Sequence, residues 1–164
     1  YELYRCDWSS DVCSSDLTRQ VNKAGLDLIK SFEGLRLEAY PDPGTGGDPW
    51  TVGYGSTKGV KKGMKITVQE AEQRLIMDLQ DACKAVERYV TIPLNDNQFA
   101  ALVSFTFNVG AGNLAVSTLL KRLNEGEYGS VPMQLMRWNR AAGKILNGLT
   151  RRRTAEGDLF QRPV

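Results

Sequence analysis

Two carboxylates and one hydroxyl in a short stretch of this chain have the residue types and spacing needed to cleave an acetal bond. Glu33 ends a helical pattern, Asp42 lies in a run of turns, and Thr51 follows these turns. Acetal cleavage needs a protonated acid at the leaving oxygen and a second carboxylate on the other side of the sugar ring. A threonine hydroxyl can orient a water molecule. By residue type alone, a glutamate such as Glu33 at a helix end is more often a solvated charge than a catalytic acid. An aspartate such as Asp42 in a turn more often only stabilises the turn.

The composition excludes several other classes of catalyst. The 164 residues contain no histidine, which removes Ser-His-Asp and Cys-His catalysis in their usual forms and argues against a catalytic zinc ion. Cys83 falls within a helical pattern, where cysteine is more often a small buried apolar residue than a nucleophile. The glycine-rich run over 44–55 has neither a Walker Gly-Lys-Ser/Thr nor a GxGxxG motif that opens a helix. We therefore predict no metal and no cofactor.

The elements that must position these residues begin with a helix over 22–32. Leu26, Ile29 and Phe32 recur at spacings of three, as on one face of a helix. Asn22 suits the N-cap, and Gly34 can end the helix in a left-handed conformation. This pattern predicts that Glu33 lies at the helix end.

A change of period after residue 34 predicts a β-hairpin. Leu35, Leu37 and Ala39 alternate with polar residues, as in a half-buried strand, and residues 50–54 alternate again. The prolines and glycines of 41–49 predict turns between the two strands, and residues 58–65 read as a basic surface loop.

The rest of the chain reads as helix. Thr67 and Glu70 form a capping box that opens a long amphipathic helix to about Val90. Further helices are predicted over 95–108, 113–124, 133–138 and 149–160, with a loop over 140–148. We therefore expect an α+β, mostly helical fold in one domain over 18–164. It has a β-containing N-terminal lobe (18–66), a connecting helix (67–91) and a helical lobe (92–164).

Residues 1–17 do not fit this organisation. They hold two of the three cysteines and lack both helical and strand periodicity, and residues 7–17 resemble one reading frame of a common sequencing adapter. Our hypothesis is that 1–17 is a translated artefact, and the alternative is a disordered tail. Of 21 Lys and Arg, one lies in 1–17, and of 19 Asp and Glu, four do, which leaves 20 basic and 15 acidic groups and a charge of +5. Such a chain is attracted to polyanions, including an anionic cell wall.

Several separated motifs resemble the phage-type lysozymes (endolysins), the family that contains the T-even phage lysozyme. The first is Glu33-Gly34-x-Arg36-Leu37-x-x-Tyr40-x-Asp42, followed by Thr51-Val52-Gly53-Tyr54-Gly55. The likeness continues, in order, through Gln98-Phe99-x-Ala101-Leu102, Ser117-Thr118-Leu119-Leu120, Arg137-Trp138-Asn139 and Arg152-Arg153-x-x-Glu156-x-x-Leu159-Phe160. It covers residues 19 to 160.

The resemblance implies a lysozyme-like fold and hydrolysis of the β-1,4 bond between N-acetylmuramic acid and N-acetylglucosamine in bacterial peptidoglycan. It makes Glu33 the proton donor, Asp42 the second catalytic carboxylate, and Thr51 the residue that holds water. Asn108 and Asn139 are candidate substrate-binding groups in the cleft.

Two departures from the family pattern leave alternatives open. Shorter family members have three fewer residues between the aspartate and the threonine, so Thr45 competes with Thr51, and Asp48 is a rival carboxylate. Ser56 stands where the family often has histidine. We interpret that histidine as structural.

Two other functions remain possible on the sequence alone. One is a lytic transglycosylase that uses Glu33 alone, and the other is a non-catalytic basic module that binds wall or nucleic acid. Separately, Arg151–Arg153 could touch anionic wall or outer-membrane lipid, and the alternative is a solvated or internally paired helix start. We expect a monomer without specific nucleic-acid binding and without a membrane span. The implied location is the host cytoplasm before lysis, with action on the cell wall, and a lost N-terminal signal-anchor is the other route.

Overall fold

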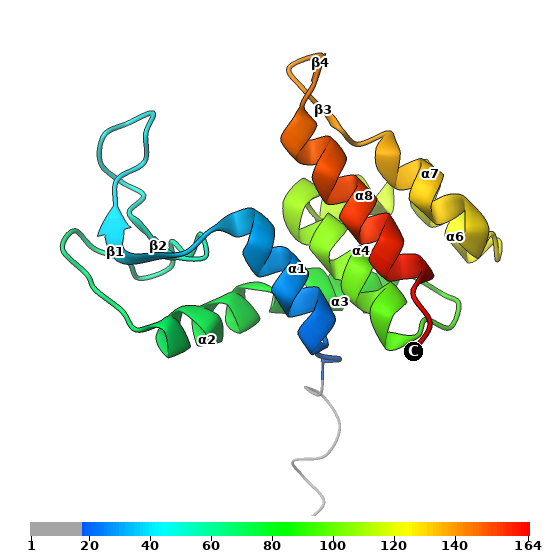
Figure 1. Cartoon of the computed structure of the whole chain (residues 1–164), viewed down its shortest axis with the longest axis horizontal. Coiled ribbons are helices and arrows are strands. Elements are labelled where there is room, and N and C mark those ends of the chain that lie inside the picture. Colours follow the sequence, from blue (N-terminus) through cyan, green and yellow to red (C-terminus); the bar gives the residue numbers. More distant parts are fainter. Residues whose placement is uncertain (1–17) are drawn as a thin grey trace, which may run out of the picture.

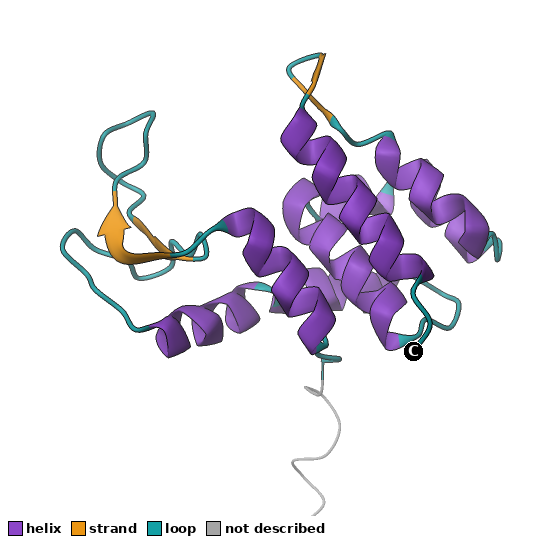
Figure 2. Cartoon of the chain, in the orientation of Figure 1, coloured by secondary structure: helices purple, strands orange, loops and turns teal. Residues whose placement is uncertain are grey.

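The computed structural model describes residues 18–164, and the interpretation of 1–17 lies outside the described residues. Helices dominate beside short antiparallel strand pairs, which confirms the α+β, mostly helical class (Figure 2). The β1–β2 pair lies at one end of the molecule and most helices gather at the other (Figure 1). In chain order the elements are α1 (Lys23–Glu33), β1 (Arg36–Tyr40), β2 (Thr51–Gly53), α2 (Val68–Asp78), α3 (Gln80–Tyr89), α4 (Asp96–Val109), α5 (Ala111–Ala115), α6 (Thr118–Asn124), η1 (Tyr128–Ser130), α7 (Val131–Met136), β3 (Arg140–Ala141), β4 (Lys144–Ile145) and α8 (Asn147–Gln161).

Helix α1 begins and ends where its capping residues predict. The Asn22 side chain accepts a hydrogen bond from the Gly25 amide at 3.0 Å, and Gly34 takes a positive φ of 72° after the last helical residue. Because glycine adopts this conformation without steric cost, the chain turns sharply there. Glu33 is therefore the last residue of the helix, and the chain leads directly from it into β1.

The predicted hairpin forms, but its burial differs from the prediction. Arg36 pairs with Gly53 and Tyr40 pairs with Thr51, with the turns of 41–50 extending beyond the two strands (Figure 1). Leu37 remains 41% exposed, although alternation predicted a buried face. Leu35 is 40% exposed as well, so the apolar stripe of this segment is only partly covered.

The connecting helix predicted over 67–91 is interrupted. The Thr67–Glu70 capping box is present, but α2 ends at Asp78 and α3 begins at Gln80. Helix α2 packs on β2, whereas α3 packs on α4 and α5. The two halves bury their apolar residues against different parts of the molecule. They are separated only by the buried Leu79, which keeps a right-handed helical backbone and hydrogen bonds to Leu75 and Cys83.

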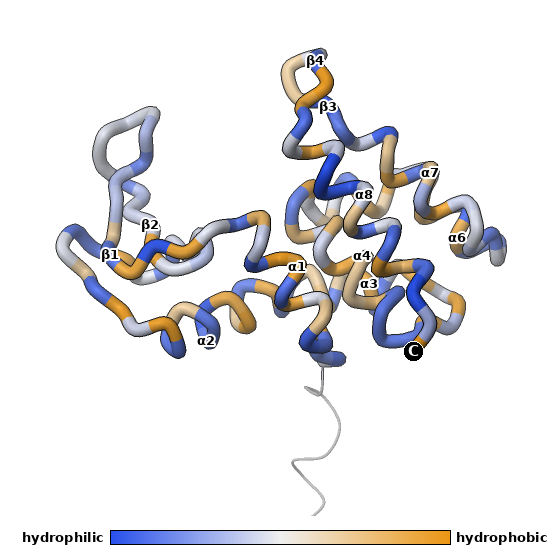
Figure 3. Tube along the Cα trace, viewed as in Figure 1, coloured by the Kyte–Doolittle hydropathy of each residue, from blue (hydrophilic) through white to orange (hydrophobic). Residues whose placement is uncertain are grey.

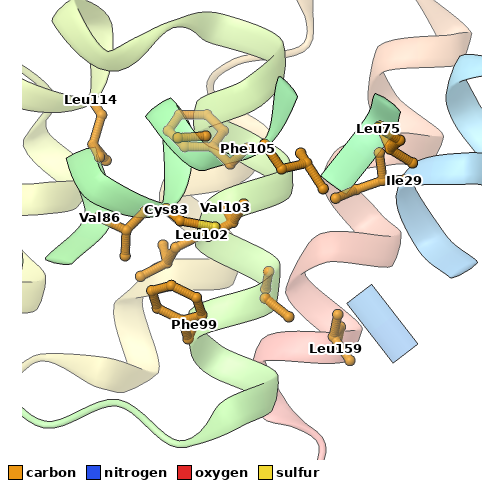
Figure 4. Close-up of a cluster of buried hydrophobic side chains, with 14 of the residues drawn as sticks. Ile29, Leu75, Cys83, Val86, Phe99, Leu102, Val103, Phe105, Leu114 and Leu159 are labelled. Carbon is orange, nitrogen blue, oxygen red and sulfur yellow. The ribbon is translucent and has the colours of Figure 1, made fainter. Parts of the chain in front are cut away.

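The core is built around α4. Phe99, Leu102, Val103 and Phe105 of this helix pack with side chains of α3, α5 and α8, including Cys83 (Figure 4). The cluster continues to Ile29 of α1 and Leu75 of α2, so one apolar core joins both ends of the molecule. Among residues 18–164, no helix has the length and apolar character required to cross a membrane.

Two further segments differ from their predictions. The helix expected over 113–124 is split into α5 and α6, because the Ser117 hydroxyl accepts a hydrogen bond from the Leu120 amide and caps a new helix start. The loop expected over 140–148 contains the β3–β4 hairpin, which turns through Ala142 and Gly143 at positive φ. Ile145 and Leu146, where this hairpin leads into α8, are exposed. The trace of the hairpin is partly coloured as hydrophobic (Figure 3).

Candidate active site

Glu33 lies between the β1–β2 hairpin and α8. Its Oε1 accepts a hydrogen bond from Arg152 Nη1 at 2.7 Å, an ion pair between residues 119 positions apart in the sequence. Its Oε2 faces the end of the hairpin, because a Cβ placed on Gly55 would lie 4.0 Å from this oxygen. The Glu33 side chain is 24% exposed. Arginine therefore holds one carboxylate oxygen, while the other lies beside the hairpin turn.

A cavity of about 690 Å³ opens beside Glu33. This volume is in the range of small-molecule sites in proteins. The end of α1, the end of α4 and the start of α8 converge on it, and it is lined by Ser31, Phe32, Glu33, Asn108, Leu146, Gly148, Leu149, Arg151 and Arg152. Apolar faces with a few charged and amide groups suit a ligand such as a sugar, which has both apolar faces and polar edges.

Beneath this cavity lies a buried charge network on α8. The Arg152 guanidinium also donates from Nε to Glu156 Oε1 at 3.2 Å and from Nη2 to the Ser104 carbonyl oxygen at 3.3 Å. Arg153 Nη1 donates to Glu156 Oε2 at 2.6 Å, and its Nη2 donates to Asn108 Oδ1. Of the two roles predicted for Arg151–Arg153, internal pairing is thus observed for Arg152 and Arg153, and Arg151 is exposed.

Burial sets the electrostatics of this network. Glu156 and Arg153 have no exposed side-chain surface. Burial raises the pKa of the Glu156 carboxyl, and the charges of Arg153 and Arg152 and the hydroxyl of Ser104 oppose that shift. Burial likewise lowers the pKa of Arg153. The network is therefore sensitive to the loss of any one charge.

Asp42 lies at the start of the turns between β1 and β2. Its Oδ1 accepts hydrogen bonds from the Gly44 and Thr45 amides, both at 2.9 Å. Within the part of the chain that the structure describes, Oδ2 has no hydrogen-bond partner. The turn thus fixes the carboxylate through one oxygen and leaves the other available. Asp42 is not among the residues that line the 690 Å³ cavity.

The two competing threonines occupy different environments. The Thr45 hydroxyl donates to the Asp48 carbonyl oxygen at 2.8 Å and accepts from the Gly47 amide at 3.3 Å, so it is used within the turn. Thr51 is the first residue of β2 and pairs with Tyr40. Asp48 is exposed. Thr51 therefore lies across the strand pair from the segment that leads to Asp42, although it does not line the cavity either.

The two candidate asparagines are separated by the structure. Asn108 lines the cavity with Glu33, and its Oδ1 accepts from Arg153, which directs the amide nitrogen away from that contact. Asn139 is not in the lining, and its side chain donates to the Thr150 hydroxyl at 3.3 Å. Of the predicted site residues, Glu33 and Asn108 are thus brought together in the cavity.

Ser56 has a structural contact, in agreement with our interpretation of that position. It is buried, and its hydroxyl donates to Asp78 Oδ2 at the end of α2. Its backbone pairs with Val52 on both sides at 2.9 Å, which closes the turn beside Glu33. The Ser56–Asp78 contact therefore ties the hairpin to α2.

Sequence reasoning did not identify Arg152, Arg153 and Glu156 as a group that supports the site. A signal was present, since Glu156 is three residues after one arginine and four after the other, the spacings at which helical side chains meet. The contact from Arg152 to Glu33 had no such local signal.

Cys83 is buried against α4, and burial raises its pKa to about 11, so the thiol is protonated at neutral pH. This agrees with a structural role. Among the described residues, no group of three or more His, Cys, Asp or Glu could hold a metal ion.

Comparison with known proteins identifies the relatives of this chain. A sequence model of the family Phage lysozyme matches residues 30–156. The chain is 40% identical over 141 residues to an endolysin of Bacillus phage B103, which covers 85% of this chain and 53% of that protein. It is 38% identical over 146 residues to an endolysin of Salmonella phage P22, which covers 86% and 97%. The solved muramidase domain of SpmX from Asticaccaulis excentricus superposes with a TM-score of 0.80 at 39% identity, covering 88% and 99%.

The chain spans 53% and 55% of the length of the similar endolysins from Bacillus phages B103 and PZA, and nearly all of the P22 endolysin. The fold is therefore lysozyme-like, as the motifs predicted, and the matched region includes Glu33, Asp42 and Thr51. This chain belongs to the phage lysozyme family.

Proposed function

We propose that this chain is a peptidoglycan muramidase, which hydrolyses the β-1,4 bond between N-acetylmuramic acid and N-acetylglucosamine and lyses the host cell wall. The observation that carries the proposal is Glu33 at the wall of a large cavity, oriented by Arg152 at 2.7 Å. The proposal also divides the chain into an N-terminal lobe (18–66), a connecting segment (67–91) and a helical lobe (92–164), with the substrate bound between the two lobes.

In this proposal Glu33 donates its proton to the glycosidic oxygen, and the bond from that oxygen to the sugar carbon breaks. Asp42, held through Oδ1 by two amides, presents Oδ2 to the electron-poor sugar carbon or to the water that attacks it. Thr51 holds this water, since the Thr45 hydroxyl is already used within the turn. The attacking water supplies the new hydroxyl of the reducing sugar and returns a proton to the site.

The test is clearing of purified peptidoglycan by the full chain, with mass analysis of the products. Muramidase action releases reducing N-acetylmuramic acid ends, whereas a transglycosylase releases 1,6-anhydro ends. Glu33→Gln is expected to lower the rate by about 10²–10⁴-fold, the usual contribution of a general acid. Glu38→Gln, which changes an exposed glutamate of β1, is the matched control and is expected to retain the wild-type rate. Full activity of folded Glu33→Gln would exclude the assignment.

The second carboxylate and the threonine are tested in pairs within the same turns. Asp42→Asn and Thr51→Ala are expected to be strongly impaired, whereas Asp48→Asn and Thr45→Ala are expected to keep most of the activity. The reverse order in either pair would move that role to Asp48 or Thr45. Loss in Glu33→Gln with full activity in both Asp42→Asn and Asp48→Asn, together with anhydro products, would favour the transglycosylase.

A further inference from the structure

One buried carboxylate has no part in the proposed chemistry. Glu156 of α8 has no exposed surface and accepts three side-chain hydrogen bonds. They come from Ser104 Oγ at 2.7 Å, Arg152 Nε at 3.2 Å and Arg153 Nη1 at 2.6 Å. A fully buried acid between two guanidinium groups is unusual, because each ion loses its hydration on burial.

The two arginines lead from Glu156 to the cavity. Arg152 continues from Nη1 to Glu33 at 2.7 Å, and Arg153 continues from Nη2 to Asn108. Both Glu33 and Asn108 line the cavity. Glu156 therefore lies at the base of a fork whose two arms end on two cavity groups.

Stability alone does not account for this fork. Buried ion pairs often contribute less than apolar side chains of the same volume, because desolvation offsets their attraction. Arg153 Nε, moreover, has no hydrogen-bond partner within residues 18–164. Buried polar groups nearly always have partners, so this unsatisfied nitrogen adds to the cost of the arrangement.

The geometry gives the fork another role. An arginine side chain has several rotatable bonds, and one contact to Glu33 does not fix its guanidinium. Arg152 is held at three points, by Glu156 at Nε, by the Ser104 carbonyl at Nη2 and by Glu33 at Nη1. The Arg152 guanidinium also lies over the Phe32 ring, with its carbon Cζ 5.7 Å from the ring centroid. Of these contacts, only those to Glu156 and Glu33 pair the Arg152 guanidinium with a carboxylate.

We propose that Glu156 is a positioning residue for the catalytic acid, acting through Arg152 to hold Glu33 in its working orientation. The inference rests on the proposed function of Glu33. A neutral residue at position 156 leaves Glu33 as the only anion bonded to Arg152, so the guanidinium moves toward it and the carboxylate leaves its working position. Displacement of a reacting group by about 1 Å can lower a rate by about 100-fold.

The experiment measures kcat and KM on soluble peptidoglycan strands for the full chain and for Glu156→Gln, with melting temperatures for each. Glu156→Gln is expected to lower kcat by about 100-fold, as estimated for such a displacement, and to change KM by less than about threefold. Glu156→Asp, which restores the charge, is expected to recover about tenfold of this loss. Leu159→Ala is the control for stability, because it removes a buried side chain on the same helix away from the cavity, and its kcat is expected to stay within about twofold of wild type.

The outcomes separate the inference from the proposed function. Wild-type kcat in folded Glu156→Gln, beside an inactive Glu33→Gln, would overturn the positioning role and leave the function intact. A wild type without product, or an active Glu33→Gln, would overturn both. If Glu156→Gln does not fold, Arg152→Lys replaces it, since one ammonium group cannot bond Glu33, Glu156 and the Ser104 carbonyl together. A folded Arg152→Lys with wild-type kcat would then refute the inference.

Discussion

The ion pair between Glu33 and Arg152 leads to a prediction in which one substitution changes the sign of its effect. Glu33 lies at the C-terminal end of α1, where the helix dipole disfavours a negative charge by about 0.3–1 kcal/mol. Its hydrogen bond to Arg152, at 2.7 Å with exposures of 24% and 6%, opposes this with about 1.5–3 kcal/mol. In the wild type the ion pair is the larger of the two effects.

Glu33→Ala is therefore expected to lower the free energy of unfolding by about 0.5–2.5 kcal/mol, the difference between these two effects. At about 2–4 °C per kcal/mol for a chain of this size, the melting temperature falls by about 1–10 °C. In an Arg152→Met background only the dipole effect remains, and the same substitution is expected to raise stability by about 0.3–1 kcal/mol. Arg152→Met alone is expected to cost about 3–5 kcal/mol, because it leaves the buried Glu156 with one guanidinium.

The assay is urea unfolding at pH 7, followed by circular dichroism, for the four proteins of the cycle. Arg151→Met is the matched control background, since Arg151 is exposed on the same helix. Glu33→Ala should there have its wild-type effect. The reasoning is refuted if Glu33→Ala has the same effect, within about 0.5 kcal/mol, with and without Arg152, because the two residues would then be energetically independent.

Three further predictions concern the scaffold. Ser56→Ala removes the half-buried hydrogen bond to the Asp78 carboxylate and is expected to cost about 1.5–3 kcal/mol in urea unfolding. A loss below about 0.5 kcal/mol would contradict this. The Cys83 pKa is raised from 9.0 to about 11 by burial, so the unfolded chain loses this proton first and stability falls as pH rises from about 9 to about 11. Urea unfolding across this range should show a fall larger by up to about 2 kcal/mol in wild type than in Cys83→Ala, and identical slopes would refute it. Gly25→Ala places a Cβ 2.5 Å from the Ala100 Cβ. The resulting overpacking is expected to cost about 1–3 kcal/mol, which outweighs the gain of about 1 kcal/mol from the helix preference of alanine, so the melting temperature should fall. An unchanged melting temperature would refute this.

The starts of helices were predictable because caps are local. Asn22, Thr67 and Asn95 each accept a hydrogen bond from an amide within three residues, so the sequence window contains the whole interaction. The interruption at Leu79 was missed for the opposite reason. The apolar stripe continues through it, and only the packing of α2 and α3 on different partners separates them.

Burial on β1 shows the same limit. Alternation reports that one face of a strand is apolar, and it does not report whether another element covers that face. In the structure Leu35 and Leu37 remain 40% and 41% exposed, so this face is not fully covered.

For the candidate site, the sequence by itself determined the chemical inventory. The absence of histidine, the glutamate at a helix end, the aspartate in a turn and the ordered motifs are all properties of residue type and short spacing. They were sufficient to predict the fold class and the family.

Only the tertiary structure decided how Glu33 is held and which groups share its cavity. Arg152 reaches Glu33 across 119 positions of sequence, and Asn108 joins them from a third helix while Asn139 does not. Neither contact has a periodicity, because each depends on where α1, α4 and α8 meet when the common core packs. A local pattern reports which face of a helix is apolar, and only the packed core determines which charged residue lies opposite another.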